Sequence, residues 1–283
     1  MSAPPSQWRI RTQFLPGRSG RLFSVYFESK IVLSDRKAVL FIPPFAEEMN
    51  KSRAVMARQA RQLAAIGIDS LIFDLYGTGD SAGQFSDATW DAWRDDLLSA
   101  WLWLEAQGVS SIHCVAVRSG ALLLDVLSAN RDTSRSKLVL WQPVTNGGLY
   151  WKQFMRLRIA AESIRGGNDS VSPAEILRRD GRVEISGYTV SALLAGPMAA
   201  SKLDLSCIAP FAQVLWVEML MSATSAVSPA GQRIVDEWQK EGLNVVMQGV
   251  GGEYFWATPE LAGVPQLHAA TNDFFLAPSE VIY

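Results

Sequence analysis

Residues 116–120 have the spacing of a sharp turn between a strand and a helix. Ala116 and Gly120 are small enough to flank such a turn, and a continuous apolar run precedes it. In enzymes that use this turn the central residue is the nucleophile, but here it is Arg118. An arginine stays protonated and cannot attack a substrate, although its five N–H donors can bind a carboxylate or a phosphate. The turn therefore predicts an anion-binding side chain where a nucleophile would be expected.

Ser119, one residue further along, is the alternative nucleophile. Its flanking residues would be Val117 and Ala121, and the β-branched Val117 would crowd the turn. Ser119 is better placed to begin the following helix and to offer its backbone N–H to an oxyanion. We keep Ser119 as a candidate catalytic residue and favour Arg118 for the centre of the turn.

The sequence offers few candidates for a general base. The two histidines are His113, inside an apolar run, and His268, in the last helical segment. We interpret His113 as a packing residue and expect His268 to face solvent or to pack locally. Glu253 stands after the last apolar run, where a base would be needed. A buried glutamate can act as a general base, so Glu253 is the candidate partner of Ser119. The acid of a triad is not evident, although Glu218 directly follows an apolar run.

The loop after the apolar run at 38–42 supplies further candidate ligand-binding residues. Phe45, Glu47 and Glu48 stand where this loop leads into a helical segment. Two adjacent acids at a helix N-terminus are favoured by the helix dipole, which is the simplest interpretation of Glu47 and Glu48. The alternative is that one of them pairs with Arg118 and helps to hold an anionic head group.

Aromatic residues near the predicted site could line an apolar pocket. Tyr254 and Trp256 are the ligand-binding candidates, and Tyr150, Trp151 and Phe255 could join them. Packing between the core of the domain and a cap would explain the same residues without a ligand.

Apolar runs and helical segments alternate along most of the chain. The runs at 8–14 and 21–27 alternate apolar and polar residues around a Pro-Gly turn, which predicts an antiparallel hairpin. Six continuous apolar runs follow, most of them separated by helical segments, and this pattern predicts a parallel sheet covered on both faces. These six runs are 38–42, 70–73, 112–117, 138–141, 214–217 and 245–247.

The loop from Asp74 through Gly77 and Gly79 to Ser81 is similar to an element common in α/β-hydrolases. A phosphate-binding loop is excluded because no Gly-Lys-Ser/Thr follows the glycines. Together with the turn at 116–120, this similarity predicts an α/β-hydrolase fold: a mixed, mostly parallel eight-stranded sheet with helices on both faces.

The stretch 145–205 interrupts the alternation of strands and helices. It contains no apolar run of the strand type, and 152–164, 173–179 and 185–200 have helical patterns. A connection of this length is too long for a simple crossover. We predict a helical cap at 145–205, inserted into a core made of 1–144 and 206–283.

Composition excludes several classes of function. The chain of 283 residues has 26 basic and 28 acidic residues, and this balance gives no reason to expect a nucleic-acid partner. No apolar stretch is long enough to span a bilayer, and the N-terminus lacks the apolar region of a signal peptide. Cys114 and Cys207 have neither metal-ligand nor redox spacing. We expect a cytoplasmic protein without a metal ion or a cofactor.

Longer motifs resemble those of the exosortase A system-associated hydrolases of the second type, members of the α/β-hydrolase superfamily. They are Pro43–Arg53, Leu140–Gly147, Gln153–Arg158 and Gly252–Trp256. The resemblance covers roughly residues 20 to 275. It implies a bacterial cytoplasmic protein in a setting of exopolysaccharide synthesis and of sorting of proteins with a PEP-type C-terminal signal. It also implies that arginine is usual at position 118, whereas Ala116 and Ser119 stand where related sequences tend to have Gly and Leu.

Three functions remain open. The first is an ester or thioester hydrolase or acyltransferase with a degenerate triad, using Ser119 or a water molecule with Glu253 as base. The second is a non-catalytic protein that binds an anionic acyl or lipid-like molecule through Arg118. The third is a scaffold for other enzymes of the pathway, with an acyl carrier as a further candidate partner.

Overall fold

The computed structural model describes residues 7–31, 35–164, 171–222, 225–258, 260 and 262–278, with the backbone alone at 160–164. Eight strands form one sheet in the order β1-β2-β4-β3-β5-β6-β9-β10. Strand β2 is antiparallel to both of its neighbours, and the strands from β4 to β10 are parallel. The strands are β1 (Trp8–Pro16), β2 (Arg21–Ser29), β3 (Lys37–Ile42), β4 (Ile68–Phe73), β5 (Ser111–Val117), β6 (Lys137–Trp141), β9 (Gln213–Leu220) and β10 (Val245–Gly251). The predicted mixed sheet, with its N-terminal hairpin, is confirmed.

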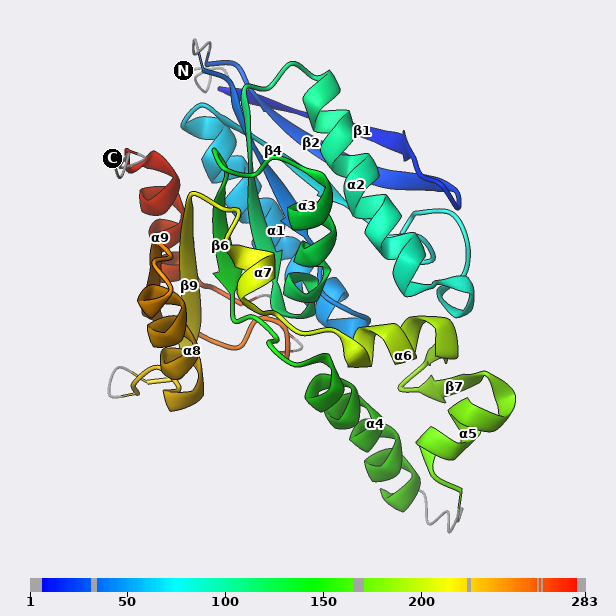
Figure 1. Ribbon diagram of the computed structural model, residues 1–283. Helices are drawn as coiled ribbons and strands as arrows, with labels where there is room; N and C mark the ends of the chain where they lie inside the picture. The colour runs from blue at the N-terminus through cyan, green and yellow to red at the C-terminus, as the bar shows by residue number, and fades with distance from the viewer. Residues whose placement is uncertain are drawn as a thin grey trace.

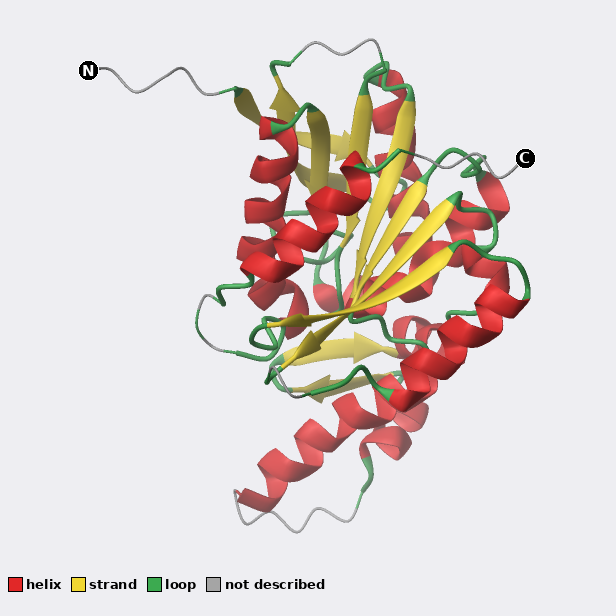
Figure 2. Ribbon diagram, turned by 90° about the vertical axis from the view of Figure 1, so that its left-hand side faces the viewer, coloured by secondary structure: helices red, strands yellow, loops and turns green. Residues whose placement is uncertain are grey.

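Helices cover both faces of the sheet (Figure 2). Side chains of β3 alternate between the faces: Val39 and Phe41 pack toward α1 and α9, and Leu40 and Ile42 pack toward α2 and α3. Both faces are apolar because both are buried, which explains the continuous apolar runs in the sequence. The helices are α1 (Glu47–Ala65) and α9 (Pro265–Leu276) on one face, and α2 (Trp90–Ala106), α3 (Leu124–Asn130) and α8 (Pro229–Lys240) on the other.

The segment between β6 and β9 forms a separate group of elements. Helices α4 and α5 project from one end of the sheet in Figure 1, and α6 lies between them and the core. The elements are α4 (Gly147–Ile164), α5 (Pro173–Asp180), β7 (Arg182–Ile185), β8 (Tyr188–Ser191), α6 (Ala192–Ala200) and α7 (Leu205–Ile208). The Ser191 hydroxyl donates to the carbonyl of Ala88 (2.7 Å), which ties this segment to the core.

The helix predicted from residue 185 onward is wrong in its first part. Strands β7 and β8 form a hairpin, and helix α6 begins only at Ala192. The turn contains Ser186 and Gly187, both with positive φ (50° and 85°). A two-residue turn of this geometry matches the twist of a hairpin, and the buried Val183 and Ile185 alternate with exposed residues. The strands were missed because each has only four residues.

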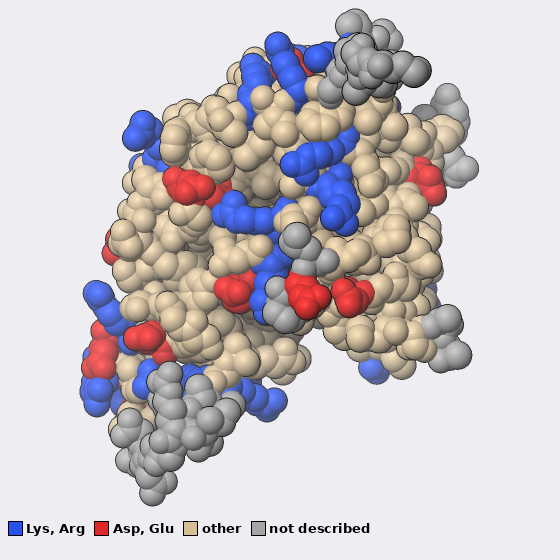
Figure 3. Space-filling model, turned by 180° about the vertical axis from the view of Figure 1, so that it is seen from behind, with Lys and Arg blue, Asp and Glu red and all other residues tan. Residues whose placement is uncertain are grey.

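Surface charge is mixed. On the face seen from behind, basic side chains gather near the centre and acidic side chains lie beside them (Figure 3). None of the helices in the described ranges is long and apolar enough to cross a membrane.

Candidate functional site

The turn after β5 holds Arg118 in a strained backbone conformation. Strand β5 ends at Val117, and the short helix η2 (Arg118–Leu123) follows at once. Arg118 has a φ of 51°, a region that non-glycine residues rarely adopt. A Cβ atom at Gly120 would lie 2.5 Å from the carbonyl oxygen of Ile42, so only glycine allows this close approach of η2 to β3. The predicted sharp turn is therefore present, with Arg118 at its centre.

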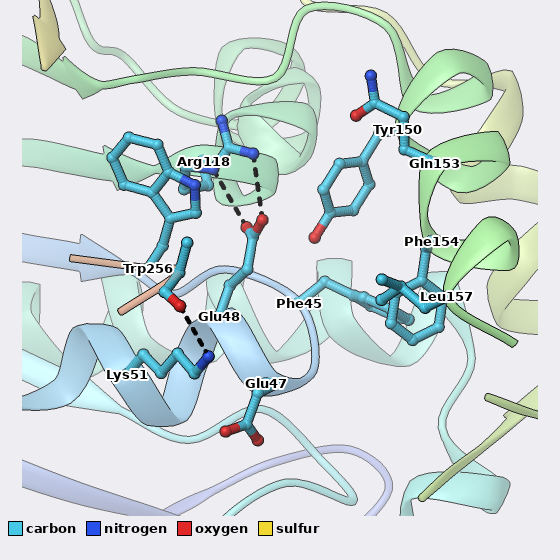
Figure 4. A pocket seen from close by; sticks show the side chains of 11 residues that line it. Phe45, Glu47, Glu48, Lys51, Arg118, Tyr150, Gln153, Phe154, Leu157 and Trp256 are labelled. Atoms are coloured by element: carbon cyan, nitrogen blue, oxygen red, sulfur yellow. Dashed lines mark hydrogen bonds and ion pairs between the residues drawn. The ribbon is translucent and has the colours of Figure 1, made fainter. Parts of the chain in front are cut away.

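The Arg118 side chain has three partners, Glu48, Gln142 and Trp256, and Figure 4 shows the first and the last of them. Its Nε and Nη2 atoms donate to the two carboxylate oxygens of Glu48 (3.3 and 3.1 Å), and Nη1 donates to the carbonyl of Gln142 (3.1 Å). The Trp256 ring lies over the guanidinium at 4.6 Å, within the range of a cation–π interaction. The side chains of Arg118 and Glu48 are only 15% and 19% exposed, so this two-point ion pair is largely shielded from water.

Tyr150 lies close to both Glu48 and Ser119. Its hydroxyl opposes the rise in the pKa of Glu48, and the Ser119 hydroxyl opposes the rise in the pKa of Tyr150. The Ser119 hydroxyl accepts from the backbone N–H of Phe45 (2.9 Å). Ser119 therefore occupies an amide donor of the loop after β3.

Burial controls the protonation of Glu48 and Tyr150. Desolvation raises the pKa of Glu48, and the nearby Arg118 charge opposes that shift. Desolvation also raises the pKa of Tyr150 well above its ordinary value, and the Glu48 charge adds to the effect. Tyr150 therefore remains a proton donor at neutral pH.

A cavity of about 350 Å³ opens beside the ion pair. Its apolar wall comes from several elements far apart in the sequence, and its polar wall contains two acids and two bases. The apolar residues include Phe45, Tyr150, Phe154, Leu157 and Trp256; the charged ones are Glu47, Glu48, Lys51 and Arg118. The volume and the mixture of aromatic and convergent polar groups are typical of a small-molecule site.

Phe45 lies at the centre of the aromatic wall. It is 2% exposed, and its ring packs edge-on against Phe154 at 5.0 Å. Helix α4 brings Tyr150, Phe154 and Leu157 to the cavity because residues three and four apart lie on one side of a helix.

Comparisons with known proteins identify the architecture. No family model matches the sequence, and no curated protein matches it. Among solved structures, Est1E from Butyrivibrio proteoclasticus with bound ferulic acid aligns with a TM-score of 0.63 at 15% identity, over 93% of this chain and 98% of that one. A proline iminopeptidase from Mycobacterium smegmatis aligns at 0.58 and 11% identity, over 93% and 97% of the two chains. An α/β serine hydrolase without lid from Xanthomonas campestris aligns at 0.54 and 17% identity, over 99% and 100%.

The chain has the α/β-hydrolase fold. Identities this low establish the fold alone, because one fold supports many functions. In the α/β-hydrolase fold the turn after the central strand carries the nucleophile, and that turn here is the one that holds Arg118.

Neither histidine lies at the position that a base occupies in the α/β-hydrolase fold. His113 is buried in β5; its Nδ1 accepts from the backbone N–H of Lys137 (3.1 Å), and its ring stacks on Phe275. Burial lowers the pKa of His113 to about 3, so it stays neutral. His268 is also buried, and its Nδ1 is 2.8 Å from the side-chain oxygen of Gln59. Both histidines are packing residues: this was predicted for His113, whereas for His268 the sequence left a solvent-facing position open.

The acids near the ends of β4 and β9 serve the backbone. Asp74 pairs with Arg53 (2.7 Å) and accepts from the N–H of Asp80 (3.0 Å), which shapes the glycine-containing loop. Glu218 accepts from both the N–H and the hydroxyl of Ser228 (2.6 and 2.7 Å) at the start of α8.

The structure brings together some of the sequence-predicted site residues and separates others. Arg118, Phe45, Glu47, Glu48 and Trp256 all line the cavity.

The remaining candidates do not line it. Ser119 is 4% exposed and is not part of the cavity wall. Glu253 is exposed, so the burial that a glutamate base would need is missing. Tyr254 is 40% exposed and stacks on the outer side of Trp256.

Five cavity residues were not among the sequence-predicted site residues: Lys51, Gln153, Phe154, Leu157 and Ala257. The spacing of Tyr150, Phe154 and Leu157 on one helix was a usable signal, because it marks an apolar stripe. Lys51 offered no such signal; it reaches the rim, and its Nζ donates to the carbonyl of Ala257 (3.0 Å). Among the described residues, no group of three or more His, Cys, Asp or Glu side chains could hold a metal ion.

Proposed function

We propose that the chain binds an acyl or lipid-like molecule in this cavity and does not cleave it. The observation that carries the proposal is the pairing of Arg118 with Glu48 at the turn where an α/β-hydrolase presents its nucleophile. The arginine of this pair cannot form a covalent intermediate with a substrate, but its N–H groups can bind a polar head group.

The surroundings of Ser119 also favour binding over catalysis. Its hydroxyl accepts from the Phe45 amide, a donor that an oxyanion would need in a hydrolase. Neither histidine contacts Ser119, since His113 bonds to Lys137 and His268 to Gln59.

The cavity wall matches an acyl chain with a polar end. Phe45, Phe154 and Leu157 supply apolar surface, and Arg118 and Gln153 supply donors beside it. Each methylene moved from water into such a cavity contributes about 0.8 kcal/mol, so a chain of several carbons gains useful affinity. We further propose that 145–205 acts as a cap on the core of 1–144 and 206–283, because α4 supplies one side of the cavity.

Calorimetric titration with octanamide and octanoate tests this function. We expect at least one of them to bind, and Leu157→Glu to weaken that binding at least tenfold by placing a charge at the rim. Leu193→Glu is the matched control, because Leu193 is a leucine of the same segment that is 68% exposed and does not line the cavity. If neither compound binds, or if both variants weaken binding equally, the proposal is wrong.

Ester or thioester hydrolysis, or acyl transfer, is the second candidate function. The position of Tyr150, close to both Ser119 and Glu48, favours it, because its hydroxyl could pass the serine proton to a carboxylate. Ser119 Oγ would attack the carbonyl, the proton would move through Tyr150 to Glu48, and the leaving group would take it back; water or an acceptor alcohol would then release the acyl group. Cleavage of 4-nitrophenyl octanoate that Ser119→Ala abolishes would favour this function over simple binding. Loss of cleavage in Glu253→Gln alone would restore Glu253 as the base.

The sequence resemblance supports a biological setting for either function. We propose that the protein acts in the cytoplasm, in a pathway linked to exopolysaccharide and the exosortase system. An acyl carrier or another pathway enzyme is then the expected partner, and a scaffold role would use the same contacts.

A further inference from the structure

Arg118 has donors to spare at the cavity. Of the five N–H groups of a guanidinium, two of those in Arg118 donate to Glu48 and one to Gln142, which leaves two without an acceptor among the described residues. Arg118 lines the cavity, so a bound molecule can reach these two donors without displacing Glu48.

The charge of Arg118, by contrast, is already compensated. Glu48 contacts it through both carboxylate oxygens, and the cavity wall as a whole carries two acids and two bases. The groups that face Glu48 are Arg118 from η2, Tyr150 from α4, and Lys51 on its own helix. The charges beside Glu48 are therefore balanced, and no net positive charge is left there to attract an anion.

From these contacts we infer that Glu48 makes the cavity select ligands with an uncharged carbonyl head group, such as an amide or an ester, and reject free carboxylates. An uncharged carbonyl oxygen can accept from the two available N–H groups. A carboxylate at the same place would lie within a few ångströms of the Glu48 carboxylate, and two like charges in a shielded site repel each other strongly.

Displacing Glu48 would not solve this problem for a carboxylate ligand. Glu48 lies largely shielded from water beside Tyr150, and a charged group left there without its cation would be costly. Glu48 therefore competes with a carboxylate ligand for the Arg118 guanidinium. The cavity gains specificity by repelling carboxylates as much as by attracting uncharged carbonyl groups.

This inference rests on the proposed binding function, and it narrows the chemical class of ligand. The test is calorimetric titration of octanamide and octanoate at pH 7.5, where octanoate is ionised. We expect the unmodified protein to bind octanamide at least tenfold more tightly. In Glu48→Gln we expect octanoate to gain at least tenfold, because the like charge is gone, while octanamide changes less than threefold.

Glu184→Gln removes one exposed acid of β7 that lies away from the cavity, and it should leave the ratio of the two affinities unchanged. Octanoate binding as tightly as octanamide to the unmodified protein would overturn the inference while leaving the binding function intact. Failure of both compounds to bind would instead remove the binding function. The ratio in the unmodified protein decides the point even if Glu48→Gln does not fold.

Discussion

Asp96 is a fully buried acid and Glu48 a half-buried one, and the two also differ in their partners. Burial raises the pKa of both, that of Asp96 to about 7. Glu48 has the Arg118 guanidinium and the Tyr150 hydroxyl as partners, and it borders a cavity. Asp96 accepts only from the N–H of Tyr76 (2.7 Å), and its other oxygen has no partner among the described residues.

The difference shows that a shifted pKa by itself does not mark a functional site. Asp96 lies in the core between α2 and the loop after β4, where no ligand can reach it. Asp96 accepts a hydrogen bond from the Tyr76 N–H. When Asp96 is ionised at high pH, its buried charge lowers the stability of the fold. Of these two acids, only Glu48 has a cation beside it and borders a cavity that a ligand can enter.

The largest expected effect is on stability, at Asp96. Because the pKa of Asp96 is raised in the folded chain, its contribution is greatest below about pH 4 and is lost as pH rises toward 7. Asp96→Asn keeps an acceptor for Tyr76 and removes the charge, so we expect it to raise the free energy of unfolding by about 2 kcal/mol at pH 8. Urea unfolding from pH 4.5 to 8 measures this gain, which should be much smaller at the acidic end. A destabilised Asn variant at pH 8 would show that the Asp96 carboxylate is better solvated than its contacts indicate.

A smaller effect is expected on breaking the ion pair. Arg118→Met keeps a non-glycine residue at the turn, so the backbone strain is unchanged. It removes the cation beside Glu48. We expect a loss of about 1 kcal/mol at pH 8, less than for a fully buried pair, because water can enter the cavity beside Glu48 when no ligand fills it, and a smaller loss at lower pH, where the raised pKa lets Glu48 take up a proton more readily. A double-mutant cycle with Glu48→Gln checks the coupling: the cost of Arg118→Met should shrink in that background. Equal costs in both backgrounds would mean that the pair contributes nothing.

The smallest effect concerns the pH dependence of anion binding. Octanesulfonate stays charged across the range, so only the protein titrates. Because the pKa of Glu48 is raised, Glu48 takes up a proton at a higher pH than an exposed glutamate does, and we expect octanesulfonate affinity to rise a few-fold as the pH falls from 8 to 5. The same titration with Glu48→Gln should be nearly flat. A profile that rises equally in both proteins would assign the pH dependence to another group.

Much of the fold could be predicted from the sequence because both faces of the sheet are buried. Strands such as 38–42 and 112–117 are apolar at every position, and the helices between them have one apolar stripe. The hairpin at 182–191 could not be separated from helix by periodicity, because strands of four residues are too short to show it.

The candidate site was predictable only in part. Arg118 was identified because the small residues around it require a sharp turn, whatever packs nearby. Ser119 and Glu253 were predicted to act together as nucleophile and base, but the structure gives them different surroundings: Ser119 is enclosed, and Glu253 faces solvent.

The sequence by itself determined the α/β architecture and the arginine at the turn, because these follow from local apolar patterns and from steric limits on a few adjacent residues. Tertiary structure alone decided that Glu48 pairs with Arg118 while Glu47 binds Tyr188 (2.9 Å). Successive residues of a helix point about 100° apart, so the docking of α1 against η2 selects between two identical neighbours. The docking of α4 beside η2 brought Tyr150 close to Glu48 and Ser119, residues too distant in the chain for any local pattern to reveal the proximity.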